Sequence, residues 1–180
     1  MDKPDRSVLT ELAATPRRLA AIFLALEPEL HRVRPPFEDQ GQPFAFVEHV
    51  WHMADLETEA FQIRLRRLRE EERPILADFD GAAAARRRDY LALDPAEGLR
   101  RFAAARARSL ETLSHVRSGE WSRRGAQEGA GELSLADLPC RMLIHDRGHL
   151  QELQTLLKAL RRDALADLAG AEAAPVGACA

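Results

Sequence analysis

The chain has 180 residues, of which 46% are apolar and 31% charged, a composition typical of a folded globular protein. Its net charge of −3 argues against a nucleic-acid partner, because contacts to phosphates need an excess of positive charge. Two cysteines are too few for a disulfide framework, and no apolar run is long enough to span a membrane. The charged N-terminus lacks the apolar region of a signal peptide, so we expect a cytoplasmic location.

Four long segments have the apolar spacing of amphipathic helices. The first has Thr15 before Pro16, and proline favours the first turn of a helix, so this segment is either two helices or one with a break. Asp94 is a natural N-cap for the third, and Ser134 with Asp137 resembles a capping box at the start of the fourth. The expected helices cover residues 7–30, 44–72, 95–116 and 134–162.

The segments between these helices are rich in proline or glycine, and none has the alternation of a β-strand. A short helix is expected near residues 82–91. The glycine-rich segment 118–133 is expected to be a mobile loop beneath which a substrate enters. We therefore predict an all-α fold, a four-helix bundle formed by residues 1–162. An Ala-rich, frayed tail is expected at residues 163–180.

The fourth predicted helix contains two histidines, His145 and His149, at a spacing of four. Residues at this spacing are about 40° apart around a helix and about 6 Å apart along it, so both side chains share one face. That face is apolar at both ends and polar in the middle, and it should point into the bundle. A buried imidazole needs a polar partner, and a metal ion is the leading candidate. The stripe consists of Leu138, Met142, His145, His149, Glu152 and Leu156.

The second predicted helix offers His49 and His52 as a third ligand. Glu48, His52, Asp55 and Glu59 follow a polar stripe beside the apolar one, because spacings of four, three and four keep residues on one side. His52 is nearer the middle of the helix, so we predict that it joins His145 and His149. For His49 we predict a surface or outer hydrogen-bonding role. Three imidazoles on one ion would leave positions open for water or substrate, as in catalytic sites.

Other patterns have simpler interpretations. A lone histidine on a helix is more often structural than a ligand, which applies to His31 and His115, and a spacing of four alone gives many chance matches. Apolar positions beside the histidine stripe exceed what one face needs, so we expect a symmetric homodimer to bury some of them. These positions are Leu143, Leu150, Leu153, Leu157 and Leu160.

The residues around the histidines resemble the DinB-like superfamily of bacterial metal-binding four-helix bundles. The similarity lies in the stretch from Phe44 to Glu57 and in the motif His145-Asp146-x-x-His149-Leu150. It implies an up-down-down-up bundle, a metal triad of His52, His145 and His149, and a homodimer. Ala45 stands where the superfamily usually has Ser or Thr, which should fray the helix start, and Glu152 stands where Gln is common.

The resemblance also implies a divalent ion, nickel or zinc, and a small-molecule substrate. Two activities fit: transfer to or from a low-molecular-weight thiol, or hydrolysis. A bound divalent ion lowers the pKa of water or a thiol toward neutrality, which suits both. The alternatives are a metal-binding stress or sensor protein without turnover, and a helical interaction module with incidental histidines. The candidates to orient the imidazoles or move protons are Glu48, Asp55, Asp146 and Glu152.

Overall fold

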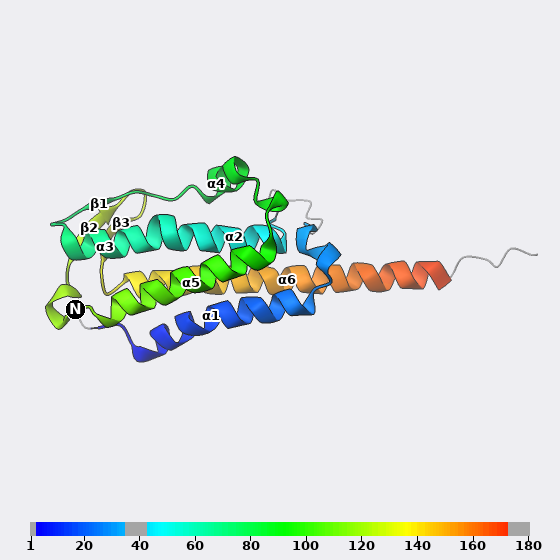
Figure 1. The fold of residues 1–180 in the computed structure, drawn as a ribbon, viewed down its shortest axis with the longest axis horizontal. Coiled ribbons are helices and arrows are strands. Elements are labelled where there is room, and N and C mark those ends of the chain that lie inside the picture. Colours follow the sequence, from blue (N-terminus) through cyan, green and yellow to red (C-terminus); the bar gives the residue numbers. More distant parts are fainter. Residues whose placement is uncertain (1–2, 35–42, 173–180) are drawn as a thin grey trace, which may run out of the picture.

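The computed structural model describes residues 3–34 and 43–172, with side chains to residue 160. Four long helices form an up-down-down-up bundle, as predicted (Figure 1). Helices α1 (Arg6–Ala25) and α6 (Leu138–Glu172) run in one direction. The helix formed by α2 (Phe46–Leu56) and α3 (Gln62–Glu70) runs in the other, as does α5 (Pro95–Ser114). The shorter helical elements are Pro28–Arg32, Gly81–Arg88 (α4), Tyr90–Ala92 and Ser118–Glu120.

Helix α1 passes through Pro16 without dividing, so of the two alternatives the single helix is the one formed. Proline has no N–H, and the carbonyl of Leu12 therefore lacks its usual partner within the helix. Nη1 of Arg106, on α5, donates to that carbonyl at 3.2 Å. A buried side chain from another helix thus compensates for the proline.

The second helix is continuous, as predicted, but contains a π-helical segment at Glu57–Phe61 between α2 and α3. A π-turn inserts one extra residue and changes which side chains face inward beyond it. Glu57 becomes buried in the bundle, although its charge suggests an exposed position. The helix start is also buried: Ala45 has no side-chain acceptor, but the Glu48 carboxylate accepts from the Ala45 N–H at 2.9 Å. The expected fraying at Ala45 is therefore wrong.

A small three-stranded sheet corrects the prediction of a fold without strands. Strand β1 (Ile75–Leu76) pairs in parallel with β2 (Arg124–Gln127), which pairs antiparallel with β3 (Gly131–Ser134). Gln127 is opposite Gly131, and Gly129 has a φ of 70° in the turn between them, a conformation that glycine adopts without strain. The segment predicted to be a mobile loop is therefore a hairpin packed on the end of the bundle, with Leu133 buried.

Gly125 should be essential for the fit of this sheet. A Cβ atom at Gly125 would lie 2.6 Å from the carbonyl oxygen of Pro74, which is backbone and cannot swing away. We expect Gly125→Ala to lower the free energy of unfolding by about 1–3 kcal/mol, measured by denaturant titration. At Gly119 a Cβ would meet nothing within 4 Å, so Gly119→Ala should change stability by about 0.5 kcal/mol or less. Equal effects of both variants would contradict this packing.

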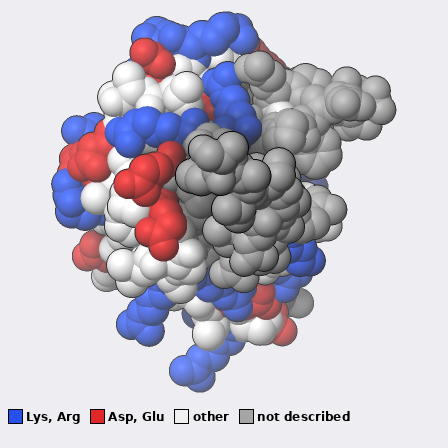
Figure 2. All heavy atoms as spheres, turned by 90° about the vertical axis from the view of Figure 1, so that its right-hand side faces the viewer, with Lys and Arg blue, Asp and Glu red and all other residues white. Residues whose placement is uncertain are grey.

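Helix α6 continues beyond Arg162 to Glu172 and projects past the other helices (Figure 1). The predicted frayed tail is thus wrong for residues 163–172, whereas 173–180 lie outside the described residues. No helix in the described part of the chain is long and apolar enough to span a bilayer. Basic and acidic side chains are interspersed on the described part of the end face that α6 leaves (Figure 2).

The leucines that suggested a dimer are covered within the single chain. Leu143, Leu150, Leu153 and Leu160 are all buried, and Leu157 is partly buried against the same core. They contact other helices of the bundle and leave no apolar stripe that a second copy must cover. The burial of these leucines therefore removes one reason for expecting a homodimer, which stays a prediction.

The apolar core is divided into two clusters along the bundle axis. One includes Leu19, Val50 and Leu153, and the other includes Leu12, Leu65 and Met142. Between these two clusters, every long helix carries polar side chains that point inward. This polar layer consists of Thr15, His52, Asp55, Glu57, Arg106, Ser109, His145, Asp146 and His149.

Candidate metal centre

Three histidine side chains converge within the polar layer. Nε2 of His145 lies 3.1 Å from Nε2 of His52 and 3.0 Å from Nε2 of His149. All three rings are partly exposed, so the group they form reaches the surface of the bundle. The residues predicted from spacing to lie close together are brought together here.

The donor set fits a divalent ion. Two nitrogens bound to one ion at about 2.0–2.1 Å lie about 2.8–3.4 Å apart for angles between 90° and tetrahedral, and the observed separations fall in that range. Three neutral imidazoles cannot satisfy one another by hydrogen bonds here. Nε2 of His145 has two nitrogen neighbours but carries at most one proton. One cation satisfies three lone pairs together. His52, His145 and His149 would hold it.

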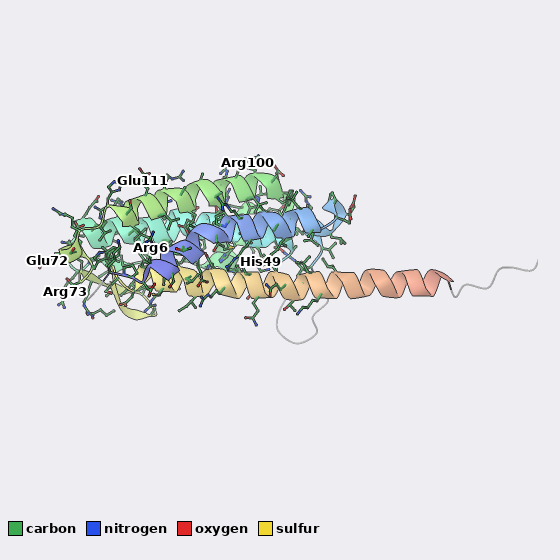
Figure 3. The ribbon with its side chains drawn as sticks, turned by 90° about the horizontal axis from the view of Figure 1, so that it is seen from below. Arg6, His49, Glu72, Arg73, Arg100 and Glu111 are labelled. Atoms are coloured by element: carbon green, nitrogen blue, oxygen red, sulfur yellow. The ribbon has the colours of Figure 1, made fainter. Side chains whose placement is uncertain are left out.

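The fourth histidine, His49, lies inside the bundle beside α6 rather than on the surface (Figure 3). It is only 2% exposed, and its Nδ1 atom is 2.9 Å from Nδ1 of His149. Of the two roles predicted for His49, the surface position is therefore wrong, whereas the outer hydrogen-bonding role stays a prediction. His31 and His115 lie apart from the group. Nε2 of His31 donates to the carbonyl of Phe23 at 3.2 Å, and His115 is exposed at the end of α5.

Burial holds the imidazoles of His49, His52 and His145 in the neutral form. Burial, the largest cause, and repulsion from the neighbouring ring of His149 together lower the pKa of His52 to about 4 and that of His49 to about 3. The pKa of His145 falls to about 2, again chiefly through burial. A neutral imidazole offers the lone pair that a metal ion needs.

Only one of the four predicted carboxylates touches the histidines. An oxygen of Glu152 lies 3.1 Å from Nδ1 of His149 and 3.7 Å from Nδ1 of His49. Glu48 instead caps α2 and accepts from Nε of Arg34 at 2.7 Å. Of the four candidates to orient imidazoles or move protons, Glu48 is therefore engaged with Arg34 and the start of α2 instead.

The other two carboxylates are also engaged elsewhere, because each has a closer partner in the core. Asp55 accepts from the Tyr90 hydroxyl at 2.6 Å and pairs with Arg88. Asp146 pairs with Arg106 through two hydrogen bonds, of 2.6 and 3.0 Å. Neither carboxylate orients a histidine in the predicted way.

The Arg106 network was not foreseen from the sequence. Its guanidinium is 1% exposed and also donates to Glu57 at 2.8 Å, while Thr15 donates to Asp146 at 2.7 Å. These contacts join all four long helices at the level of His145, the residue before Asp146. The sequence does indicate that Arg106 faces inward. It shares one helix face with Phe102, Ser109 and Leu113, at spacings of four, three and four.

Aromatic side chains surround the histidine group. The ring of Phe44 is 5.7 Å from the centres of both the His49 and His52 rings. Phe79 lies 5.9 Å from His52, and Phe61 lies 6.0 Å from His145. The rings around the histidines thus come from the segment just before α2, from the π-helical segment between α2 and α3, and from the segment between β1 and α4. The hairpin beneath which a substrate was expected to enter packs at the end of the bundle where α3 ends and α6 begins (Figure 1).

Gly81, at the start of α4, sets the position of the His52 ring. A Cβ atom there would lie 2.4 Å from Cε1 of His52 and 2.7 Å from its Nδ1. We expect Gly81→Ala to push the ring aside and to weaken divalent-metal binding about 10-fold or more, measured by chelator competition. At Gly148, between two of the ligands, a Cβ would meet nothing within 4 Å, so Gly148→Ala should bind as wild type. Equal affinities of Gly81→Ala and wild type would contradict this role.

The metal-free protein should lose stability as the pH falls below about 6.5. An unfolded histidine titrates near that value, whereas burial keeps the pKa of His52 near 4 and that of His145 near 2. Between these limits the unfolded chain binds more protons, so acid favours unfolding. Thermal melts of chelator-treated protein from pH 7.5 to 5 should show a falling midpoint, and His145→Leu should flatten the curve. A midpoint that rises over this range would contradict the expectation.

Comparisons with known proteins agree with this fold. A sequence model of the DinB superfamily matches residues 11–153. YfiT from Bacillus subtilis superimposes with a TM-score of 0.75 over 88% of this chain and 93% of that chain, at 18% identity. It is described as a probable metal-dependent hydrolase with an unusual four-helix bundle topology, and at this identity the likeness shows the fold alone. Among curated proteins there is no match.

Proposed function

The chain belongs to the DinB superfamily, and from that premise we propose that it is a divalent-metal-dependent enzyme acting on a small molecule. The observation that carries the proposal is the convergence of three imidazole nitrogens: Nε2 of His145 lies 3.1 Å from Nε2 of His52 and 3.0 Å from Nε2 of His149. Three protein ligands leave coordination positions for water or substrate, whereas structural sites are usually closed by four. A structural ion is also unnecessary here, because two apolar clusters already hold the bundle.

The donor set favours nickel or zinc, because imidazole ligands suit these ions. When bound, such an ion supplies Lewis acidity that brings the pKa of a water or thiol toward neutrality. Glu152 is placed to hold a proton beside the centre: it contacts His149 and is itself exposed to solvent. The contact with His149 lowers the pKa of Glu152, so its carboxylate is ionised at neutral pH.

We propose that a small substrate enters through a cavity near the histidines. A cavity of about 380 Å³ lies between the start of α2 and helix α4, and Phe44 and Tyr90 form parts of its wall. The ring of Phe44 also packs against His49 and His52, so it separates this cavity from the metal centre. Movement of one side chain would connect the two. We propose hydrolysis or transfer involving a low-molecular-weight thiol as the reaction.

The test is a rate measurement on protein purified without an affinity tag and loaded with nickel or zinc. Hydrolysable esters, amides and phosphoesters form one panel, and a low-molecular-weight thiol with carbon electrophiles forms the other. We expect turnover in one panel that disappears on chelation and in His52→Ala. A protein that binds one ion but turns over nothing in either panel would contradict the proposal and favour the sensor or stress-protein alternative.

A further inference from the structure

His49 is the most deeply buried of the four histidines in and beside the metal centre. It is not one of the three predicted ligands, so its buried position needs another explanation. Its Nδ1 atom is 2.9 Å from Nδ1 of His149, with the two rings at 73°. We propose that His49 is a positioning residue: its Nδ1 atom accepts a hydrogen bond from the Nδ1–H group of His149. This contact keeps the proton of His149 on Nδ1 and leaves the Nε2 lone pair of His149 free for the ion. This inference rests on the proposed metal centre.

The assignment of the protons follows from the geometry. Nε2 of His149 lies 3.0 Å from Nε2 of His145 and is the nitrogen assigned to the ion. A nitrogen that binds an ion carries no proton, so in the metal-bound form neutral His149 carries its proton on Nδ1. Only one of two nitrogens 2.9 Å apart can hold a proton in that contact. Nδ1 of His49 is therefore the acceptor, and the proton of His49 resides on its own Nε2.

Glu152 competes for the same proton but is the weaker candidate. Its oxygen is 3.1 Å from Nδ1 of His149, yet its side chain is 61% exposed and hydrated, whereas His49 is buried and held between Phe44 and His149. A carboxylate partner raises the basicity of a ligating imidazole. A neutral imidazole partner does so less, and thus leaves more of the positive charge of an ion available to polarise substrate.

A second ion is the competing interpretation of the same atoms. His49, His149 and Glu152 also lie close enough to share a cation. That ion and the first would need both nitrogens of His149, which one neutral imidazole cannot provide because one of them is protonated. The positioning role therefore predicts one ion per chain.

Four forms of the full chain separate these roles: wild type, His49→Leu, His49→Asn and Glu152→Gln. Asn places an oxygen acceptor near the position of Nδ1, whereas Leu has a similar size and no acceptor. Zinc affinity by chelator competition, zinc stoichiometry, and ¹⁵N NMR signals of the His149 ring in the zinc form are measured. Circular dichroism and metal-free melting temperatures report the fold separately.

We expect one zinc per wild-type chain, with the His149 proton on Nδ1. His49→Leu should bind zinc about 10–100-fold more weakly while melting close to wild type without metal, and His49→Asn should recover most of the affinity. Glu152→Gln should weaken binding about fivefold or less, because exposed pairs contribute little.

Three results would overturn the inference. They are wild-type affinity in His49→Leu, a larger loss in Glu152→Gln than in His49→Leu, and two zinc ions per wild-type chain. If wild type binds zinc and His49→Leu has no effect, this inference alone fails. If wild type binds no divalent ion, the proposed function fails with it.

Discussion

Replacement of His149 by Ala should abolish stoichiometric binding of nickel or zinc and any metal-dependent turnover. His149 supplies Nε2 to the group of three and contacts His49 through Nδ1, so its loss removes a ligand and the hydrogen bond that orients it. The affinity should fall by more than the about 10–100-fold that loss of an outer partner costs. Metal analysis after dialysis, together with the rate assays, measures both effects.

The same variant should remain a folded helical protein. The two apolar clusters lie on either side of the polar layer, so the helices pack without the ion. A ligand that binds only the native state still stabilises it, so added nickel or zinc should raise the melting temperature of wild type and not of the variant. Loss of helical circular dichroism in His149→Ala would show that the centre is structural.

Replacement of Arg106 by Met should cause a large loss of stability. The substitution leaves Glu57 and Asp146, each 1% exposed, without the cation that pairs with both, and it removes the donor to the Leu12 carbonyl. Breaking a buried ion pair from one side typically costs about 3–5 kcal/mol, because the remaining charge is desolvated and unpaired. Denaturant unfolding of the metal-free protein measures this.

Two further variants separate charge from packing. Arg108→Met, on the same helix but exposed, should change stability by about 0.5 kcal/mol or less. Adding Glu57→Gln and Asp146→Asn to Arg106→Met removes the unpaired charges and should recover part of the loss. Wild-type stability in the single Arg106 variant would contradict the assigned role of the network.

The sequence was sufficient to predict the long helices and the grouping of His52, His145 and His149. Both depend on regular helical spacing, which places apolar side chains or ligands on one face. The deep burial of His49 was missed because the approach of α6 depends on packing between helices, and the burial of Glu57 was missed because it depends on the π-segment. No local pattern distinguishes Glu57 as the start of a π-turn.

The Arg106 network was missed for a related reason. In a chain with 26 basic residues, one arginine in an Ala- and Arg-rich helix resembles a solvated residue, and its partners are Leu12, Glu57 and Asp146, far away in the sequence. The position of Arg106 between Phe102 and Ser109 in an inward stripe was the available signal. The hairpin was missed because strands of four residues containing glycine lack a readable alternation.

The central claim is that three imidazoles bind one ion, and anomalous diffraction from crystals grown with nickel or zinc tests it most directly. We predict a single peak at the absorption edge of the metal, about 2.0–2.1 Å from Nε2 of His52, His145 and His149. A peak bound by His49 and Glu152 without His52, or no peak at a saturating concentration of either metal, would contradict the account.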